Sequence, residues 1–217
     1  DFAQDVFEYI RQQSQKDNDD LVAISFDIQG FFDNLDHAIL KNAWKQILGL
    51  NEHDLLPKDH YQIFKVITHF SYVELNELFN LFQHNIIIKN KSGKIRKKQI
   101  KKKQYLKDQN AIAFCELKDL HIIRKNGLIK KKDLNNGICQ GSSISATLAN
   151  IYMLAFDEYV NQEILKIGGL YRRYSDDMVV VCSLNYRDKI IDLFKNAITN
   201  IAKLSIQDKK TQIFHFR

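Results

Sequence analysis

The chain has 217 residues, 45% of them hydrophobic, including 14 Phe and 9 Tyr, which is enough for a core in one large domain or two small ones. One Pro and 8 Gly exclude a low-complexity linker, and no apolar run is long enough to span a membrane. The net charge of +6 arises in one segment, because residues 89–107 hold ten Lys or Arg and no acid, whereas the remainder carries 22 basic and 26 acidic residues, or −4.

The cysteines and the first residue indicate the cellular compartment and whether the sequence is part of a longer protein. Cys115, Cys139 and Cys182 form no Cys-x-x-Cys pair, which favours a reducing compartment over a disulfide framework or a zinc site. No secretory signal opens the chain, so we expect a cytoplasmic protein. Residue 1 is Asp rather than Met, and we therefore expect a piece of a longer protein.

The first third of the chain predicts a helix over residues 1–18, a polar break at 16–20 and a buried strand at 21–27 that ends in a carboxylate, Asp27. Asp36 is a suitable N-cap for the helix that follows it. Pro57 opens another helix, predicted to extend to Phe70.

The middle third has a further apolar helical patch at residues 73–82 and then a predicted exposed basic hairpin within residues 85–107, with a turn at 91–93. Either this segment binds an anionic partner or it is simply a solvated charged face. Residues 109–136 give no clear pattern.

Residues 136–145 are rich in small side chains, which allow a backbone to approach a ligand, and their serines are candidate helix caps. The helix predicted next, over residues 146–164, has an expected inward face of Leu148, Ile151, Tyr152, Ala155 and Tyr159.

The last part predicts a hairpin of strands 170–174 and 178–182, a helix over 188–201 and a strand at 212–216, which together indicate an α+β or α/β domain. The hairpin turn carries Asp176 next to Asp177. Such a pair is commonly a solvated turn, but the end of a second strand also carries a carboxylate, Asp27. Three carboxylates there could hold two Mg²⁺ ions for nucleotidyl transfer.

Four ordered motifs resemble bacterial reverse transcriptases. Residues 26–37, FDIQGFFDNLDH, resemble their first palm motif. Residues 140–145, QGSSIS, with LANIY at 148–152, resemble the next motif, and YSDD at 174–177 resembles their Tyr-x-Asp-Asp turn. Lys210 and Thr211 resemble the lysine motif that follows, so the resemblance runs from about residue 19 to the end.

The resemblance implies a right-hand polymerase palm, an antiparallel sheet backed by helices, with part of the fingers. It implies an RNA-directed DNA polymerase that transfers dNTPs to a primer 3′-hydroxyl with two Mg²⁺ ions, or Mn²⁺ in their place. The implied partners are an RNA template or an associated non-coding RNA and a DNA primer, with no membrane. The whole of residues 1–217 would be the reverse transcriptase domain, with an insertion at about 85–135.

The resemblance also assigns roles to individual residues. The implied catalytic and metal-binding residues are Asp27, Ile28 through its carbonyl, Asp176, Asp177 and Lys210. The implied nucleotide-binding residues are Phe31, Phe32 as a steric gate, Gln140, Gly141 and Tyr174. For Phe32, the alternative is an ordinary place in the core. For nucleic-acid binding we nominate a lysine set of Lys97, Lys98, Lys101, Lys102 and Lys103.

Within the family, the sequence looks more like retron-type and defence-associated enzymes, including the abortive-infection kind, than like group II intron maturases, which suggests a role in antiviral defence against phage. Cys139 and Ala146 stand where the family often has Pro. Untemplated DNA synthesis, RNA synthesis and a catalytically inactive nucleic-acid-binding module are the alternatives. We expect fingers upstream and a thumb downstream, and therefore expect residues 1–217 alone to extend a primer poorly.

Overall fold

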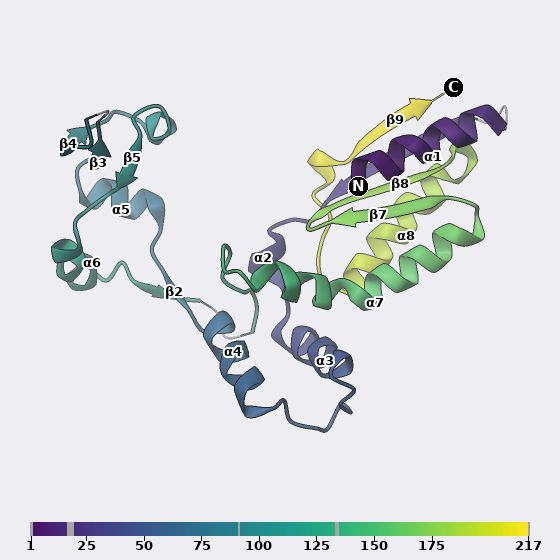
Figure 1. Cartoon of the computed structure of the whole chain (residues 1–217), viewed down its shortest axis with the longest axis horizontal. Coiled ribbons are helices and arrows are strands. Elements are labelled where there is room, and N and C mark those ends of the chain that lie inside the picture. Colours follow the sequence, from purple (N-terminus) through teal and green to yellow (C-terminus); the bar gives the residue numbers. More distant parts are fainter. Residues whose placement is uncertain (1, 17–19, 91, 133–134, 217) are drawn as a thin grey trace. The chain divides into compact units, whose positions relative to one another are not determined.

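The computed structural model describes residues 2–16, 20–90, 92–132 and 135–216. They form two compact units, each described by itself below (Figure 1). The inserted unit is Phe70–Lys132, and the sheet unit comprises the described residues on either side of it. Most of the predicted polar break, residues 17–19, and Lys91 of the predicted basic turn lie outside the described residues.

The sheet unit is built on one antiparallel sheet with the strand order β7-β8-β1-β9. These strands are β1 (Leu21–Asp27), β7 (Leu170–Tyr174), β8 (Asp177–Ser183) and β9 (Gln212–Phe216). All four strands were predicted, and β7 and β8 pair as the expected hairpin. The central position of β1 explains its almost wholly apolar sequence, since both faces of a central strand are covered.

Helices cover both faces of this sheet (Figure 1). On one face, Val22, Ile24 and Phe26 of β1 join the main core with residues of α7 (Ser145–Lys166) and α8 (Arg187–Asn200). On the other face, Ala23, which lies between Val22 and Ile24 in β1, packs with Val6 and Ile10 of α1 (Phe2–Lys16). The alternation of side chains along β1 thus places one helix pair and one single helix on opposite faces. The predicted α+β fold, an antiparallel sheet backed by helices, is confirmed.

The buried face of α7 differs from the predicted one. Ala155 and Tyr159 are exposed, and the side chains that the helix buries are Ser145, Leu148, Ala149, Tyr152, Met153, Phe156, Val160 and Ile164. The predicted serine cap is also wrong, because Ile144 is the N-cap residue and the Ser145 hydroxyl donates to the Cys139 carbonyl at 2.6 Å. Apolar residues lie around much of α7, so periodicity alone selected a stripe beside the buried one.

Three more helices complete the sheet unit: α2 (Phe31–Asn34), α3 (His37–Ile47) and α4 (Lys58–Thr68). The Asp36 carboxylate caps α3 as predicted, accepting from the amides of Ala38 at 2.8 Å and Ile39 at 3.0 Å. Pro57 precedes α4 as predicted, but the helix ends before Phe70.

The inserted unit has its own small core. Its helices are α5 (Leu75–Leu81) and α6 (Leu120–Lys125), and its strands are β2 (Ser71–Tyr72), β3 (Asn85–Lys89), β4 (Ile95–Gln99), β5 (Ala111–Ala113) and β6 (Lys130–Lys131). Phe79, Ile86, Ile88 and Ile100 form the core, and Ile86 and Ile88 belong to β3, the middle strand of a sheet of order β4-β3-β5. β3 and β4 are the predicted hairpin, and every residue of β4 is exposed.

The described residues also include four short 3-10 segments, η1 (Lys103–Tyr105), η2 (Leu117–Asp119), η3 (Leu184–Tyr186) and η4 (Asp208–Lys210). None of the helices within the described ranges is both long enough and apolar enough to cross a bilayer.

Candidate active site

Strand pairing brings the predicted carboxylates together at one end of the sheet. Asp27, the last residue of β1, is the register partner of Asp177, the first residue of β8. The loop residue Asp176 is held beside them, because its carbonyl accepts from the Ile28 amide at 3.3 Å. All three acids line one cavity of about 400 Å³.

Most of the residues nominated from the sequence meet at this cavity. Its walls include Asp27, Ile28, Phe31, Phe32, Gln140, Tyr174, Asp176, Asp177 and Lys210. Gly141, the next residue after Gln140, has a φ of 88° and does not line the cavity. The lysine set belongs to the inserted unit.

Charge in the cavity is partly balanced within the protein. The Lys210 ammonium, at the end of η4, lies 3.1 and 3.0 Å from the two carboxylate oxygens of Asp27. Burial raises the pKa of Asp177, the carboxylates of Asp176 and Asp27 raise it further, and Lys210 opposes them. The three acids are therefore close enough to repel one another, and the site favours a bound positive charge.

The donor chemistry fits Mg²⁺, which prefers carboxylate oxygens, water and substrate phosphates. Within the described ranges, no group of three or more His, Cys, Asp or Glu side chains is already arranged to hold a metal ion. Asp27 pairs with Lys210, and all three acids line the cavity. Asp27, Asp176 and Asp177 are the residues that would hold the ion.

The apolar wall of the cavity is fixed by backbone pairing between distant segments. The backbone amides of Gly137 and Ile138 donate to the carbonyls of Leu35 and Phe32, respectively, both at 2.8 Å. These hydrogen bonds hold the segment that leads to Gln140 beside α2. Phe32 is half-buried and packs against the main core, with its ring centroid 5.3 Å from that of buried Phe31. Phe32 therefore has both a core contact and a face on the cavity.

A tight backbone path at Gly30 makes this wall possible. Gly30 has a φ of 55°, and a Cβ there would lie 2.8 Å from the Asn34 amide nitrogen. That nitrogen donates to the carbonyls of Gln29 at 3.0 Å and Gly30 at 3.1 Å. Because a side chain at position 30 would disturb this turn, glycine is required where the chain passes from β1 into α2.

Three contributors to the site were given no role from the sequence: Asp33, which lines the cavity, Gln207 and Arg173. Gln207 lines the cavity, and its backbone N–H donates to the backbone carbonyl of Asp27 at 2.8 Å. Arg173, immediately before the YSDD turn, donates to the Ser175 carbonyl at 2.9 Å. The only sequence signal for Arg173 was a charged residue within a strand, which implies a buried ionic partner but does not identify it.

The fold is the palm fold of reverse transcriptases. It is similar to apo telomerase from Candida tropicalis (TM-score 0.54, 15% identity, 97% of this chain and 31% of that chain). It is also similar to telomerase from Candida albicans in complex with a TWJ fragment of telomeric RNA (TM-score 0.52, 14% identity, 98% of this chain and 30% of that chain). This chain therefore spans about a third of the length of these structures.

The sequence model of reverse transcriptase (RNA-dependent DNA polymerase) matches residues 58–216. The chain belongs to the reverse transcriptase family. Comparison with curated protein sequences gives no match.

Proposed function

We propose that this chain provides the polymerase site of an RNA-directed DNA polymerase, which transfers dNTPs to a primer 3′-hydroxyl. One observation carries the proposal: in a reverse transcriptase family chain, Asp27, Asp176, Asp177 and Lys210 line the same cavity as Phe32 and Gln140. The cavity thus joins acidic, basic and apolar walls at the ends of two paired strands.

The proposed chemistry assigns a task to each wall. When bound, two divalent ions supply the charge neutralisation that activates the primer hydroxyl and stabilises the leaving pyrophosphate. Asp27 and Asp176 are the principal ligands, with Asp177 and the Ile28 carbonyl beside them. Lys210 gives up its contact with Asp27 and donates a proton to the pyrophosphate. Gln140, Gly141 and Tyr174 contact the nucleotide and the templating base.

Primer extension by the full-length protein tests the proposal. An RNA template, an annealed DNA primer, dNTPs and either Mg²⁺ or Mn²⁺ should give product whose sequence follows the template. Product that forms without a template would favour the alternative of untemplated synthesis. Binding of nucleic acid without any incorporation would favour the inactive binding module.

Replacing Phe32 with Ala should weaken selection against ribonucleotides. The ring lines the cavity on its apolar side, where we propose that it occupies the space of a 2′-hydroxyl. The ratio of kcat/KM for dNTP to that for rNTP should fall by at least about tenfold, the scale set by steric fit in a pocket. Phe70→Ala, outside the cavity lining, is the control, and an unchanged ratio in Phe32→Ala would remove Phe32 from the gate.

The lysine set is our candidate for contact with nucleic-acid phosphates. Some of its charge is already engaged, since Lys97 pairs with Glu116 at 3.5 Å, Lys98 donates to Gln109 and Lys103 donates to Asn76. Arg96 and Lys98 of β4 project from the face opposite to Lys97, because side chains alternate along a strand. Basic charge is therefore available on both faces of this exposed strand.

Neutralising the lysine set to Gln should flatten the salt dependence of nucleic-acid binding by the full-length protein. Each phosphate that the variant no longer neutralises should reduce the slope of log affinity against log salt concentration by about 0.7 to 0.9. The control neutralises five exposed lysines outside the set: Lys58, Lys65, Lys125, Lys166 and Lys189. Equal slopes for the two variants would leave the set as a solvated surface.

The finer assignments also remain proposals. The motif resemblance supports a retron-type or defence-associated enzyme acting in the cytoplasm, and an RNA bound as template or as a stable partner. The two compact units support a palm that carries an insertion. Sequencing the nucleic acid that copurifies with this protein would identify the template, and phage plating on cells with and without the gene would test the defence role.

A further inference from the structure

The loop between β7 and β8 holds an unfavourable backbone conformation. Tyr174 and Asp177 are register partners, so Ser175 and Asp176 form a two-residue loop. Ser175 has a φ of 58°, in the left-handed region that favours glycine over residues with a side chain. A loop of this kind keeps its shape only when surrounding contacts hold it.

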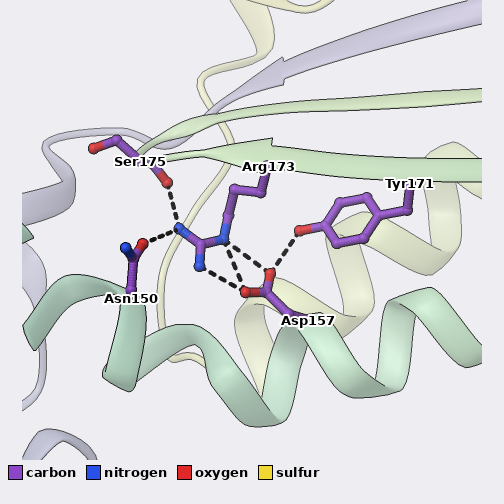
Figure 2. Close-up of polar contacts among 5 residues, drawn as sticks. All are labelled: Asn150, Asp157, Tyr171, Arg173 and Ser175. Carbon is purple, nitrogen blue, oxygen red and sulfur yellow. Dashed lines mark hydrogen bonds and ion pairs between the residues drawn. The ribbon is translucent and has the colours of Figure 1, made fainter. Parts of the chain in front are cut away.

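Arg173 supplies one of these contacts from the strand itself. Its Nη1 donates to the Ser175 carbonyl at 2.9 Å and to the Asn150 side-chain oxygen at 3.1 Å (Figure 2). The Ile28 amide holds the Asp176 carbonyl at 3.3 Å. The two carbonyls of the loop are therefore each tied to a different neighbour.

The Arg173 guanidinium is itself fixed by α7. Its Nε lies 2.9 and 3.1 Å from the two Asp157 carboxylate oxygens, and its Nη2 donates to Asp157 at 2.6 Å. The Tyr171 hydroxyl donates to the same carboxylate at 2.7 Å. Burial and then the Asp157 charge raise the pKa of Tyr171, which keeps its hydroxyl protonated as a donor. The Arg173 side chain is only 8% exposed, whereas the Asp157 side chain is 26% exposed, so the guanidinium is the more shielded partner of this ion pair.

We propose that Arg173 is a positioning residue that holds the Ser175–Asp176 loop from behind, so that the Asp176 carboxylate faces Asp27 and Asp177. Asp157 and Asn150 orient the guanidinium, and its planar fork can serve the carboxylate and the Ser175 carbonyl at the same time. This inference rests on the proposed function for its kinetic consequence, but the hold on the loop can be measured without catalysis.

The neighbouring arginine provides a matched control. Arg172 lies one residue earlier in β7, so its side chain projects from the opposite face of the sheet. It also pairs with an aspartate, since its Nε lies 3.1 Å from an Asp5 carboxylate oxygen. The Arg172 side chain is half-exposed, and neither Arg172 nor Asp5 lines the carboxylate cavity. Replacing Arg172 removes an Arg–Asp ion pair from the same strand, although a more exposed one, without touching the loop.

The experiment compares Arg173→Lys, Arg173→Gln and Arg172→Gln in the full-length protein. A lysine keeps the positive charge beside Asp157 but cannot make the forked contact. Hydrogen exchange of a peptide covering residues 174–178 should become about tenfold faster in both Arg173 variants, as expected when one charge-assisted hydrogen bond is removed. Exchange in the rest of the sheet, and everywhere in Arg172→Gln, should match the wild type.

Two further measurements connect the loop to the site. Binding of Mn²⁺ without nucleotide, followed by electron paramagnetic resonance, should weaken in the Arg173 variants and not in Arg172→Gln. The kcat for dNTP incorporation should fall about 10- to 100-fold for Arg173→Lys, the scale of a small misplacement of reacting groups. The KM for dNTP should change by less than about twofold, because the nucleotide pocket is intact.

The outcomes separate this inference from the proposed function. Loop exchange in Arg173→Lys equal to that in Arg172→Gln would overturn the positioning role, whatever the activity. A wild type that incorporates no dNTP would end the proposed function, while loop exchange still decides the role of Arg173. If the Arg173 variants do not fold, Asn150→Ala replaces them: it should speed exchange in the same peptide by a smaller factor, and an unchanged loop would overturn the inference.

Discussion

Replacing Asp176 with Asn should reduce dNTP incorporation by the full-length protein about a thousandfold, the upper end of the range seen when one group that stabilises a transition state is removed. The side chain keeps its size and loses the charge that would bind the divalent ion. The fold should survive, because the loop is tied through backbone carbonyls of Ser175 and Asp176.

The same variant carries a second expectation on stability. The carboxylates of Asp176 and Asp27 both act to raise the pKa of Asp177, so the wild type contains mutual repulsion that the variant relieves. Thermal unfolding of Asp176→Asn without divalent ions should therefore occur at the wild-type temperature or slightly above it. Asp192→Asn, on the exposed face of α8, is the control for both measurements. Wild-type incorporation by Asp176→Asn would remove this residue from the proposed site.

The largest effect on stability should come from replacing Phe194 with Ala. Phe194 of α8 is fully buried, and its ring stacks on Phe26 with a centroid separation of 4.6 Å. It also makes edge contacts with Phe156 at 6.0 Å and Tyr171 at 5.7 Å. Removing a ring from such a cluster costs about 3–5 kcal/mol of unfolding free energy, from the reduced burial and the cavity that remains.

Urea denaturation of the full-length protein measures this decrease. The expected change is a large part of the total stability of a typical domain, which is about 5–15 kcal/mol. Phe7→Ala is the control, because Phe7 of α1 is 67% exposed and its replacement should change the free energy by about 0.5 kcal/mol or less. A decrease below about 1 kcal/mol for Phe194→Ala would mean that this ring cluster is not central to the core.

Local signals in the sequence were sufficient for the strands and the acids. The β-branched run after Asp177 and the apolar run before Asp27 indicated two buried strands, and both are present. Asp36 and Pro57 marked helix starts because such residues act through their neighbours in the chain, although Pro57 is the N-cap residue of α4 and not part of its first turn. Four motifs in order indicated the family; the family match over residues 58–216 covers the last three of them, and the first motif, residues 26–37, precedes the match.

Contacts between distant segments could not be read in the same way. Arg173 and Asp157 are 16 residues apart and lie on a strand and a helix, so no local pattern links them. The pairing of Lys210 with Asp27 depends on where η4 places the amine. The buried face of α7 was misjudged at Tyr159 because several apolar stripes of that helix were equally periodic. In each case the information lies in the packing of elements, which a single sequence does not state.

The register of β1 against β8 makes the acidic site an all-or-none feature of the sheet. Asp27 and Asp177 are partners in the same ladder that pairs Ile24 with Val180 in the core. A shift by one residue would turn Asp27 toward the opposite face and move Val22, Ile24 and Phe26 from the α7 and α8 side of the sheet to the α1 side, where the core is built around smaller residues. Small errors in strand alignment therefore cannot produce a slightly displaced site in an otherwise intact protein. Any molecule whose β1 and β8 pair in this register brings Asp27 and Asp177 together, so correct folding of the sheet and formation of the acidic site are the same event.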